Sequence, residues 1–166
     1  MLSKSLLISL RMQHTFCIIM LLFSFPLIQA QTKLPKSAEK GTIDLSSWDF
    51  ENEGSIKLIG EWEFYWDTLI APTQLPNTLT PKYYSFPHIW SELPDDEVNY
   101  SQFGYATYRL NIILPNNNKV MALHLHDFYT AYRLWLNDTL IAENGIVGVS
   151  ADESIPKWIT VTKPFS

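Results

Sequence analysis

Cysteine is almost absent from this sequence. Of the 166 residues only Cys17 is a cysteine, and it lies close to the N-terminus between Phe16 and Ile18. That position does not fit the end of a lipoprotein-type cleavage box. If the N-terminal segment is removed, as argued below, the mature chain has no cysteine. A disulfide framework, a thiol nucleophile and a thiolate metal site are then excluded.

Basic residues are also scarce. Lys and Arg number 12 against 17 Asp and Glu, which gives a formal net charge of −5. A nucleic-acid groove needs a basic patch, so we expect no nucleic-acid partner. The sequence contains no P-loop, dinucleotide-binding fingerprint or Gly-x-Ser-x-Gly elbow. We therefore expect a protein that is not an enzyme and holds no cofactor.

The first 30 residues have the pattern of an export signal. Lys4 and Arg11 form a positive start, and no charged residue occurs from Met12 to Thr32. An apolar run covers residues 16–23, and Ala30 offers a small residue before a cut at Gln31. We expect cleavage there and an exported protein, periplasmic or at the cell surface. An uncleaved membrane anchor is the alternative, but the strongly apolar part is short for a span of ~20 residues.

Aromatic residues are plentiful, at 14% of the chain, and hydrophobic residues make up 46%. Such a chain folds, and its aromatics suit pleated sheets. Residues 31–40 read as a flexible lead-in, and short alternating runs follow it, as is typical of strands. The expected strands are Thr42–Leu45, Ser55–Leu58, Glu61–Trp66, Tyr83–Phe86, Tyr105–Leu114, Val120–His126, Ala131–Leu136, Thr139–Glu143 and one that begins with Trp158–Val161.

These strands predict an all-β fold, a jelly-roll β-sandwich over residues 41–166. No run of ten or more residues after the signal shows a helical apolar period. Asn137 and Asp138 separate two strands by two residues, which indicates a tight hairpin. The final strand begins just before Ser166 and would leave an open apolar edge. We therefore expect a domain truncated at its C-terminus or a last strand that pairs late.

Alternation also divides the side chains between two faces. Trp62, Phe64, Trp66 and Tyr108 are expected in the core. Glu61 and Glu63 are expected to point outward into solvent rather than to form a catalytic pair. His124 and His126 share a face, but no third metal ligand is identifiable, so we expect no metal site. The candidate ligand-binding residues project from the outward face: Tyr105, Arg109, His124, His126, Arg133 and Trp135.

Aromatic planes can stack on sugar rings, and Arg offers fork-shaped donors to carboxylates or hydroxyls. The outward face is therefore interpreted as a ligand site or as a surface that docks another domain. A simple solvated face is the third reading. His124 and His126 would lie between the other residues if their strands are neighbours.

Several strings together resemble a known family. They are Gly41–Phe50, Leu58–Trp66, Phe86–Trp90, Gly104–Leu110, Ala131–Asn137 and Gly145–Gly148, in this order. They resemble the extracellular N-terminal domain of bacterial seven-transmembrane receptors with diverse intracellular signalling modules. That domain is similar to the galactose-binding-domain-like jelly roll of β-galactosidase-like glycoside hydrolases. In this chain Asp138 follows Asn137, where the family usually has Gly.

The resemblance implies an extracytoplasmic sensor for a carbohydrate or other small-molecule ligand. In such receptors a membrane domain and a cytoplasmic output domain follow, and this sequence contains neither. The alternatives are an accessory sugar-binding domain of a secreted glycoside hydrolase and a structural docking module. No ligand-binding residue is carried over from the family, so the six candidates above rest on alternation alone.

Overall fold

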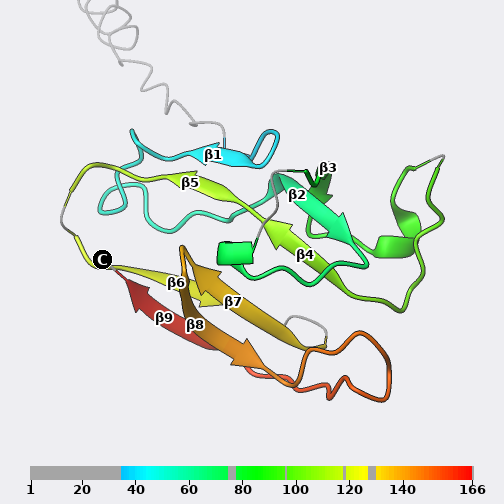
Figure 1. Ribbon diagram of the computed structural model, residues 1–166. Coiled ribbons are helices and arrows are strands. Elements are labelled where there is room, and N and C mark those ends of the chain that lie inside the picture. Colours follow the sequence, from blue (N-terminus) through cyan, green and yellow to red (C-terminus); the bar gives the residue numbers. More distant parts are fainter. Residues whose placement is uncertain (1–34, 75–77, 96, 118, 127–129, 166) are drawn as a thin grey trace, which may run out of the picture. The chain divides into compact units, whose positions relative to one another are not determined.

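The computed structural model describes residues 35–74, 78–95, 97–117, 119–126 and 130–165 (Figure 1). The expected export signal, Cys17 and the first part of the lead-in lie outside these residues. Within the described chain there are nine strands and two short 3₁₀ helices, and no helix is long and apolar enough to cross a membrane. The elements are β1 (Thr42–Asp44), β2 (Gly60–Trp66), η1 (Pro72–Gln74), β3 (Lys82–Phe86), η2 (Trp90–Glu92), β4 (Ala106–Arg109), β5 (Asn111–Ile113), β6 (Met121–Leu125), β7 (Tyr132–Leu136), β8 (Thr139–Asn144) and β9 (Val161–Phe165).

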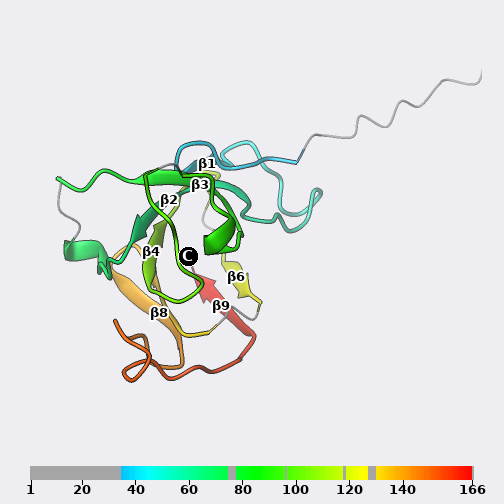
Figure 2. The ribbon, with the colours of Figure 1, turned by 90° about the vertical axis from the view of Figure 1, so that its right-hand side faces the viewer.

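The strands form four small sheets. The largest has the order β3-β2-β4 and is antiparallel throughout (Figures 1 and 2). β1 pairs with β5 in parallel, while β6 pairs with β9 and β7 with β8 in antiparallel fashion. The predicted all-β class is confirmed at this level, as a mostly antiparallel β-rich fold.

Strand β2 forms the centre of the largest sheet, and both of its faces are covered. On one face Phe64 is only 2% exposed. On the other face Glu63 and Tyr65 are buried as well. The expectation that Glu63 points into solvent is therefore wrong, although Glu61 is exposed. Alternation separates the two faces of a strand, but it does not show that a second layer of chain covers the polar one.

A core forms where the chain enters the fold. Ala38, Ile43 and Leu45 are nearly inaccessible, and Trp62 packs against them as expected of a core residue. Ala38 also bridges to Gly60 at the start of β2. This part of the expected lead-in is thus built into the domain, because the backbone of Ala38 extends the edge of β2 through hydrogen bonds with Ile59 and Glu61.

Three expected strands differ in the structure. Ser55–Leu58 forms no strand. The run Tyr105–Leu114 is divided at Leu110, because β4 pairs with β2 whereas β5 pairs with β1. The last strand begins at Val161 rather than Trp158 and pairs with β6.

The expected hairpin between β7 and β8 is confirmed. Leu136 and Thr139 are partners across the turn, and Asn137 adopts a positive φ of 52°. Asn tolerates this conformation better than most residues. A register shift between Leu134 and Trp135 interrupts the pairing, so that Trp135 faces Leu140. This irregularity changes the alternation on which the position of Trp135 was predicted.

Candidate functional site

The candidate site begins with the side chains of β3. Along this strand Lys82, Tyr84 and Phe86 are partly buried, whereas Tyr83 and Ser85 are exposed. Pairing with β2 sets this pattern, since Tyr84 lies opposite Trp62 and Phe86 opposite Gly60. The partly buried side chains of β3 therefore face the aromatic residues of β2.

Phe64 is the centre of an aromatic cluster behind the site. Its ring lies 5.1–6.0 Å, centroid to centroid, from five other rings. Aromatic pairs at such distances favour edge-to-face and tilted arrangements, and these are the geometries present. The cluster fixes the positions of residues that are far apart in the sequence. Its outer members are Trp66, Tyr84, His88, Tyr100 and Tyr108.

A chain of hydrogen bonds orients His88 within this cluster. The Trp90 Nε1–H donates to the Tyr108 hydroxyl at 2.6 Å, and that hydroxyl lies 3.1 Å from His88 Nε2. His88 Nδ1 lies 2.7 Å from the Ser85 carbonyl oxygen. A carbonyl only accepts, so Nδ1 carries a proton and, in the neutral ring, Nε2 accepts from Tyr108. Burial raises the pKa of Tyr108 to about 12, which keeps this hydroxyl protonated as a donor.

Asp95 holds the loop after η2 against β3. Its Oδ2 accepts hydrogen bonds from the hydroxyls of Tyr84 at 2.6 Å and Tyr100 at 2.9 Å, and it also contacts the Lys82 ammonium group. Its Oδ1 accepts from the backbone N–H groups of Glu97 and Val98. These interactions, with Lys82 first and Tyr84 next, hold the pKa of Asp95 well below its usual value.

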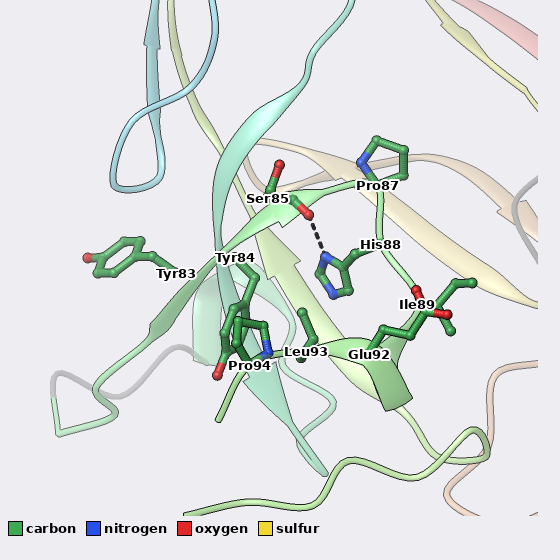
Figure 3. A pocket seen from close by; sticks show the side chains of 9 residues that line it. All are labelled: Tyr83, Tyr84, Ser85, Pro87, His88, Ile89, Glu92, Leu93 and Pro94. Atoms are coloured by element: carbon green, nitrogen blue, oxygen red, sulfur yellow. Dashed lines mark hydrogen bonds between the residues drawn. The ribbon is translucent and has the colours of Figure 1, made fainter. Parts of the chain in front are cut away.

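A pocket of about 590 Å³ opens between β3 and η2. This volume lies within the range of roughly 300–1,000 Å³ that small-molecule sites occupy. Figure 3 shows the His88 ring turned into the space between β3 and η2, whereas the Tyr83 ring points away from it. The lining residues come from β3, the turn after it and η2 with its continuation: Tyr83, Tyr84, Ser85, Pro87, His88, Ile89, Glu92, Leu93 and Pro94.

Glu92 and Ile89 are two of the exposed residues that line the pocket. Ile89 is 58% exposed, which is high for an isoleucine. The Glu92 carboxylate forms no hydrogen bond or ion pair with any described residue. The rim thus combines an apolar side chain with an acceptor that lacks a partner. Together they suit a molecule with both C–H surface and hydrogen-bond donors.

The residues predicted from alternation are not gathered at this pocket. Tyr105 and Arg109 belong to the β4 segment, His124 and His126 to the β6 segment, and Arg133 and Trp135 to β7. These three strands lie in three different sheets. His124 and His126 were expected to lie between the other residues only if their strands were neighbours. β6 pairs with neither β4 nor β7, so this expectation is wrong. That these six residues bind a ligand stays a prediction.

Three of these six predicted residues already have side-chain partners. Arg109 contacts Glu63, with Nη2 2.8 Å from Oε1 and Nε 2.5 Å from Oε2. His124 Nδ1 lies 2.8 Å from the Thr162 hydroxyl of β9, and its ring lies edge-on to that of His126. Arg133 stands opposite Glu143 in the register.

A second, smaller pocket of about 280 Å³ lies between β8 and β9, and its lining includes Glu143 and Lys163. It falls below the usual size of a ligand site. Among the residues that the structure describes, no group of three or more His, Cys, Asp and Glu side chains is arranged to hold a metal ion.

His88, Glu92 and Asp95 were not named as site residues from the sequence. One signal was present: the dense aromatic string Tyr83–Trp90, in which a single His stands two residues before Trp90. The partners that give these residues their positions, Tyr108 and Tyr100, lie up to 20 residues away in the sequence.

The chain matches no protein-family model, and the comparisons with curated proteins and solved structures found no match.

Proposed function

We propose that the chain is an exported, non-enzymatic ligand-binding domain that takes a carbohydrate in the pocket between β3 and η2. In this proposal it is the extracytoplasmic sensor of a bacterial membrane signalling receptor, with membrane and cytoplasmic output domains as partners. Its four small sheets would then be parts of a galactose-binding-like jelly roll.

The observation that carries the ligand-binding proposal is the combination of His88 and Glu92 in one pocket. His88 is oriented by Tyr108 and Ser85, so its ring is preorganised and needs little ordering when a ligand arrives. Glu92 supplies a free acceptor for sugar hydroxyls, and Ile89 supplies apolar surface for the C–H face of the ring. A few placed polar groups in an otherwise apolar cleft are typical of small-molecule sites.

Titration calorimetry of the purified chain with a panel of mono- and oligosaccharides tests this proposal. We expect saccharide binding that weakens in Ile89→Ala, because this substitution removes exposed apolar surface at the rim. Phe103→Ala is the matched control, since Phe103 is 87% exposed and does not line the pocket. Equal loss in both variants, or no saccharide binding by the wild type, would contradict the proposal.

A docking module is the second candidate function, and a specific observation favours it. Five large apolar side chains in the segment 146–159 are at least 39% exposed, with Trp158 at 56%. Apolar side chains in such number suit contact with another protein domain. The calorimetric test separates the two functions, because a pure docking module binds no saccharide. The exposed residues are Ile146, Val149, Ile155, Trp158 and Ile159.

A further inference from the structure

The formal charge among the residues that line the pocket between β3 and η2 is of one sign. Its nine lining residues include one carboxylate, Glu92, and no Lys or Arg. The ammonium group of Lys82, on the same strand, is bound to Asp95 and lies 3.9 Å from Glu97. Among these lining residues, an anionic ligand would therefore meet the Glu92 carboxylate and no Lys or Arg.

The hydrogen bonds of His88 also disfavour an anionic ligand. The Nδ1 proton is donated to the Ser85 carbonyl, and in the neutral ring Nε2 is occupied by the Tyr108 hydroxyl. Neither ring nitrogen is left to donate to a carboxylate or a phosphate. Of the charged and imidazole groups in the pocket, the Glu92 carboxylate is the one that remains free, and it only accepts. The site is thus suited to a ligand that donates hydrogen bonds.

From these observations we infer that the pocket selects a sugar that carries a protonated amino group, with Glu92 as the residue that recognises the ammonium. This inference rests on the proposed carbohydrate-binding function and specifies its ligand class. An ammonium group has three donors and a positive charge, so it gains more from a free carboxylate than a hydroxyl does. The same carboxylate disfavours an acidic sugar, because like charges repel and no Lys or Arg among the lining residues offsets the repulsion.

Calorimetry with three matched probes tests the inference. The probes are glucosamine oligomers, N-acetylglucosamine oligomers of the same length, and galacturonic acid oligomers, at a pH at which the free amino groups are protonated. We expect the glucosamine oligomer to bind about fivefold more tightly than its N-acetylated counterpart, which corresponds to ~1 kcal/mol, the upper end for an exposed ion pair. We expect the galacturonic acid oligomer to bind most weakly, and the preference for the amino form to fall with added salt.

The variant Glu92→Gln removes the charge while keeping the size of the side chain. We expect it to abolish the preference for the amino form and to leave the affinity for the N-acetylated oligomer nearly unchanged. Glu39→Gln is the matched control: it changes the net charge equally, its carboxylate is exposed, and it does not line the pocket. This control should keep the preference.

The outcomes distinguish the two proposals. If none of the three oligomers binds and the wider saccharide panel also fails, the carbohydrate-binding function itself is wrong. If saccharides bind but the acidic oligomer is equal or preferred, or if Glu92→Gln keeps the preference for the amino form, only the inference about ligand class is overturned. A preference lost equally in Glu39→Gln would show a nonspecific charge effect and would also overturn it.

Discussion

Glu63 on β2 and Arg109 on β4 are register partners whose side chains meet in a two-point ion pair, with Nη2–Oε1 at 2.8 Å and Nε–Oε2 at 2.5 Å. The carboxylate also accepts a hydrogen bond from the Tyr65 hydroxyl at 2.9 Å. Burial, and next this hydrogen bond, raise the pKa of Tyr65 to about 12. The pair therefore neutralises a carboxylate that would otherwise be buried without a cation.

Replacement of Arg109 by Ala should destabilise the domain, because it leaves Glu63 buried and unpaired. The side chain of Arg109 is 54% exposed, so water screens part of the effect. We expect a loss of about 1–2 kcal/mol, the lower part of the range of ~1–3 kcal/mol for a buried polar group left without its partner. Urea unfolding followed by tryptophan fluorescence measures it.

Arg133→Ala is the control for that experiment. Arg133 is exposed on β7 opposite Glu143, and its removal should cost no more than ~0–1 kcal/mol. Equal destabilisation by the two substitutions would show that the Glu63–Arg109 pair has no special role. On alternation alone both arginines were expected to be free for ligand, and only the structure separates them.

The sequence predicts a strand most reliably where one face of that strand is clearly apolar. Trp62, Phe64 and Trp66 mark β2, and Asn137 marks the β7–β8 turn, because both signals are local. The division at Leu110 was not predictable, since the apolar alternation continues through it while the partner strand changes from β2 to β1.

The candidate site was less predictable than the strands, because its residues are positioned by contacts between segments that are separated in the sequence. His88 is positioned by Tyr108, and Asp95 by Lys82, Tyr84 and Tyr100. These contacts join segments that the chain brings together only when β3 and β4 pair with β2. The spacing of these residues in the sequence does not predict such contacts. Asp95, which the sequence does not single out, therefore anchors the loop after η2 through contacts that only the folded chain brings together.

Trp62→Ala should cost on the order of 3–5 kcal/mol, because Trp62 stacks on Phe86 with ring centroids 4.3 Å apart and packs against the core. Trp62→Phe should cost less than about 1.5 kcal/mol. The indole Nε1 is buried and has no partner among the described residues, so the smaller ring loses no hydrogen bond there. Thermal unfolding of the two variants compares them. A Trp62→Ala protein that melts like wild type would contradict the core assignment.

Acid should remove the contribution of Asp95 to stability. Its folded pKa lies below the ordinary value of 3.8, so this contribution is fully present above that value and is lost as the pH falls through the folded pKa. The stability difference between wild type and Asp95→Asn should thus be largest near neutral pH and shrink below about pH 4. Urea unfolding at a series of pH values tests it. A difference that stays constant down to about pH 2 would argue against a paired Asp95.

Tyr108→Phe should remove the hydrogen bond to His88 Nε2 and leave the Nδ1 proton in place, because the Ser85 carbonyl still accepts from Nδ1. The substitution removes the hydroxyl that lies 3.1 Å from Nε2 and accepts from Trp90. In wild type we expect the ¹⁵N shifts of the His88 ring to show a protonated Nδ1 and an unprotonated Nε2 in the neutral form. In the variant Nδ1 should stay protonated, and the Nε2 shift should change because its hydrogen bond from Tyr108 is lost. Identical Nε2 shifts in both proteins would mean that the Tyr108 hydroxyl does not bond to His88.

The central claim is that the pocket between β3 and η2 is the ligand site. Two-dimensional ¹H–¹⁵N NMR of the chain, titrated with the tightest-binding saccharide of the panel, tests it most directly. We expect saturable shift changes concentrated in residues 83–94, with those of His88, Ile89 and Glu92 among the largest. Changes concentrated instead at Arg133 and Trp135 on β7, with the signals of residues 83–94 unmoved, would show that the ligand binds at the site expected from alternation and not in this pocket.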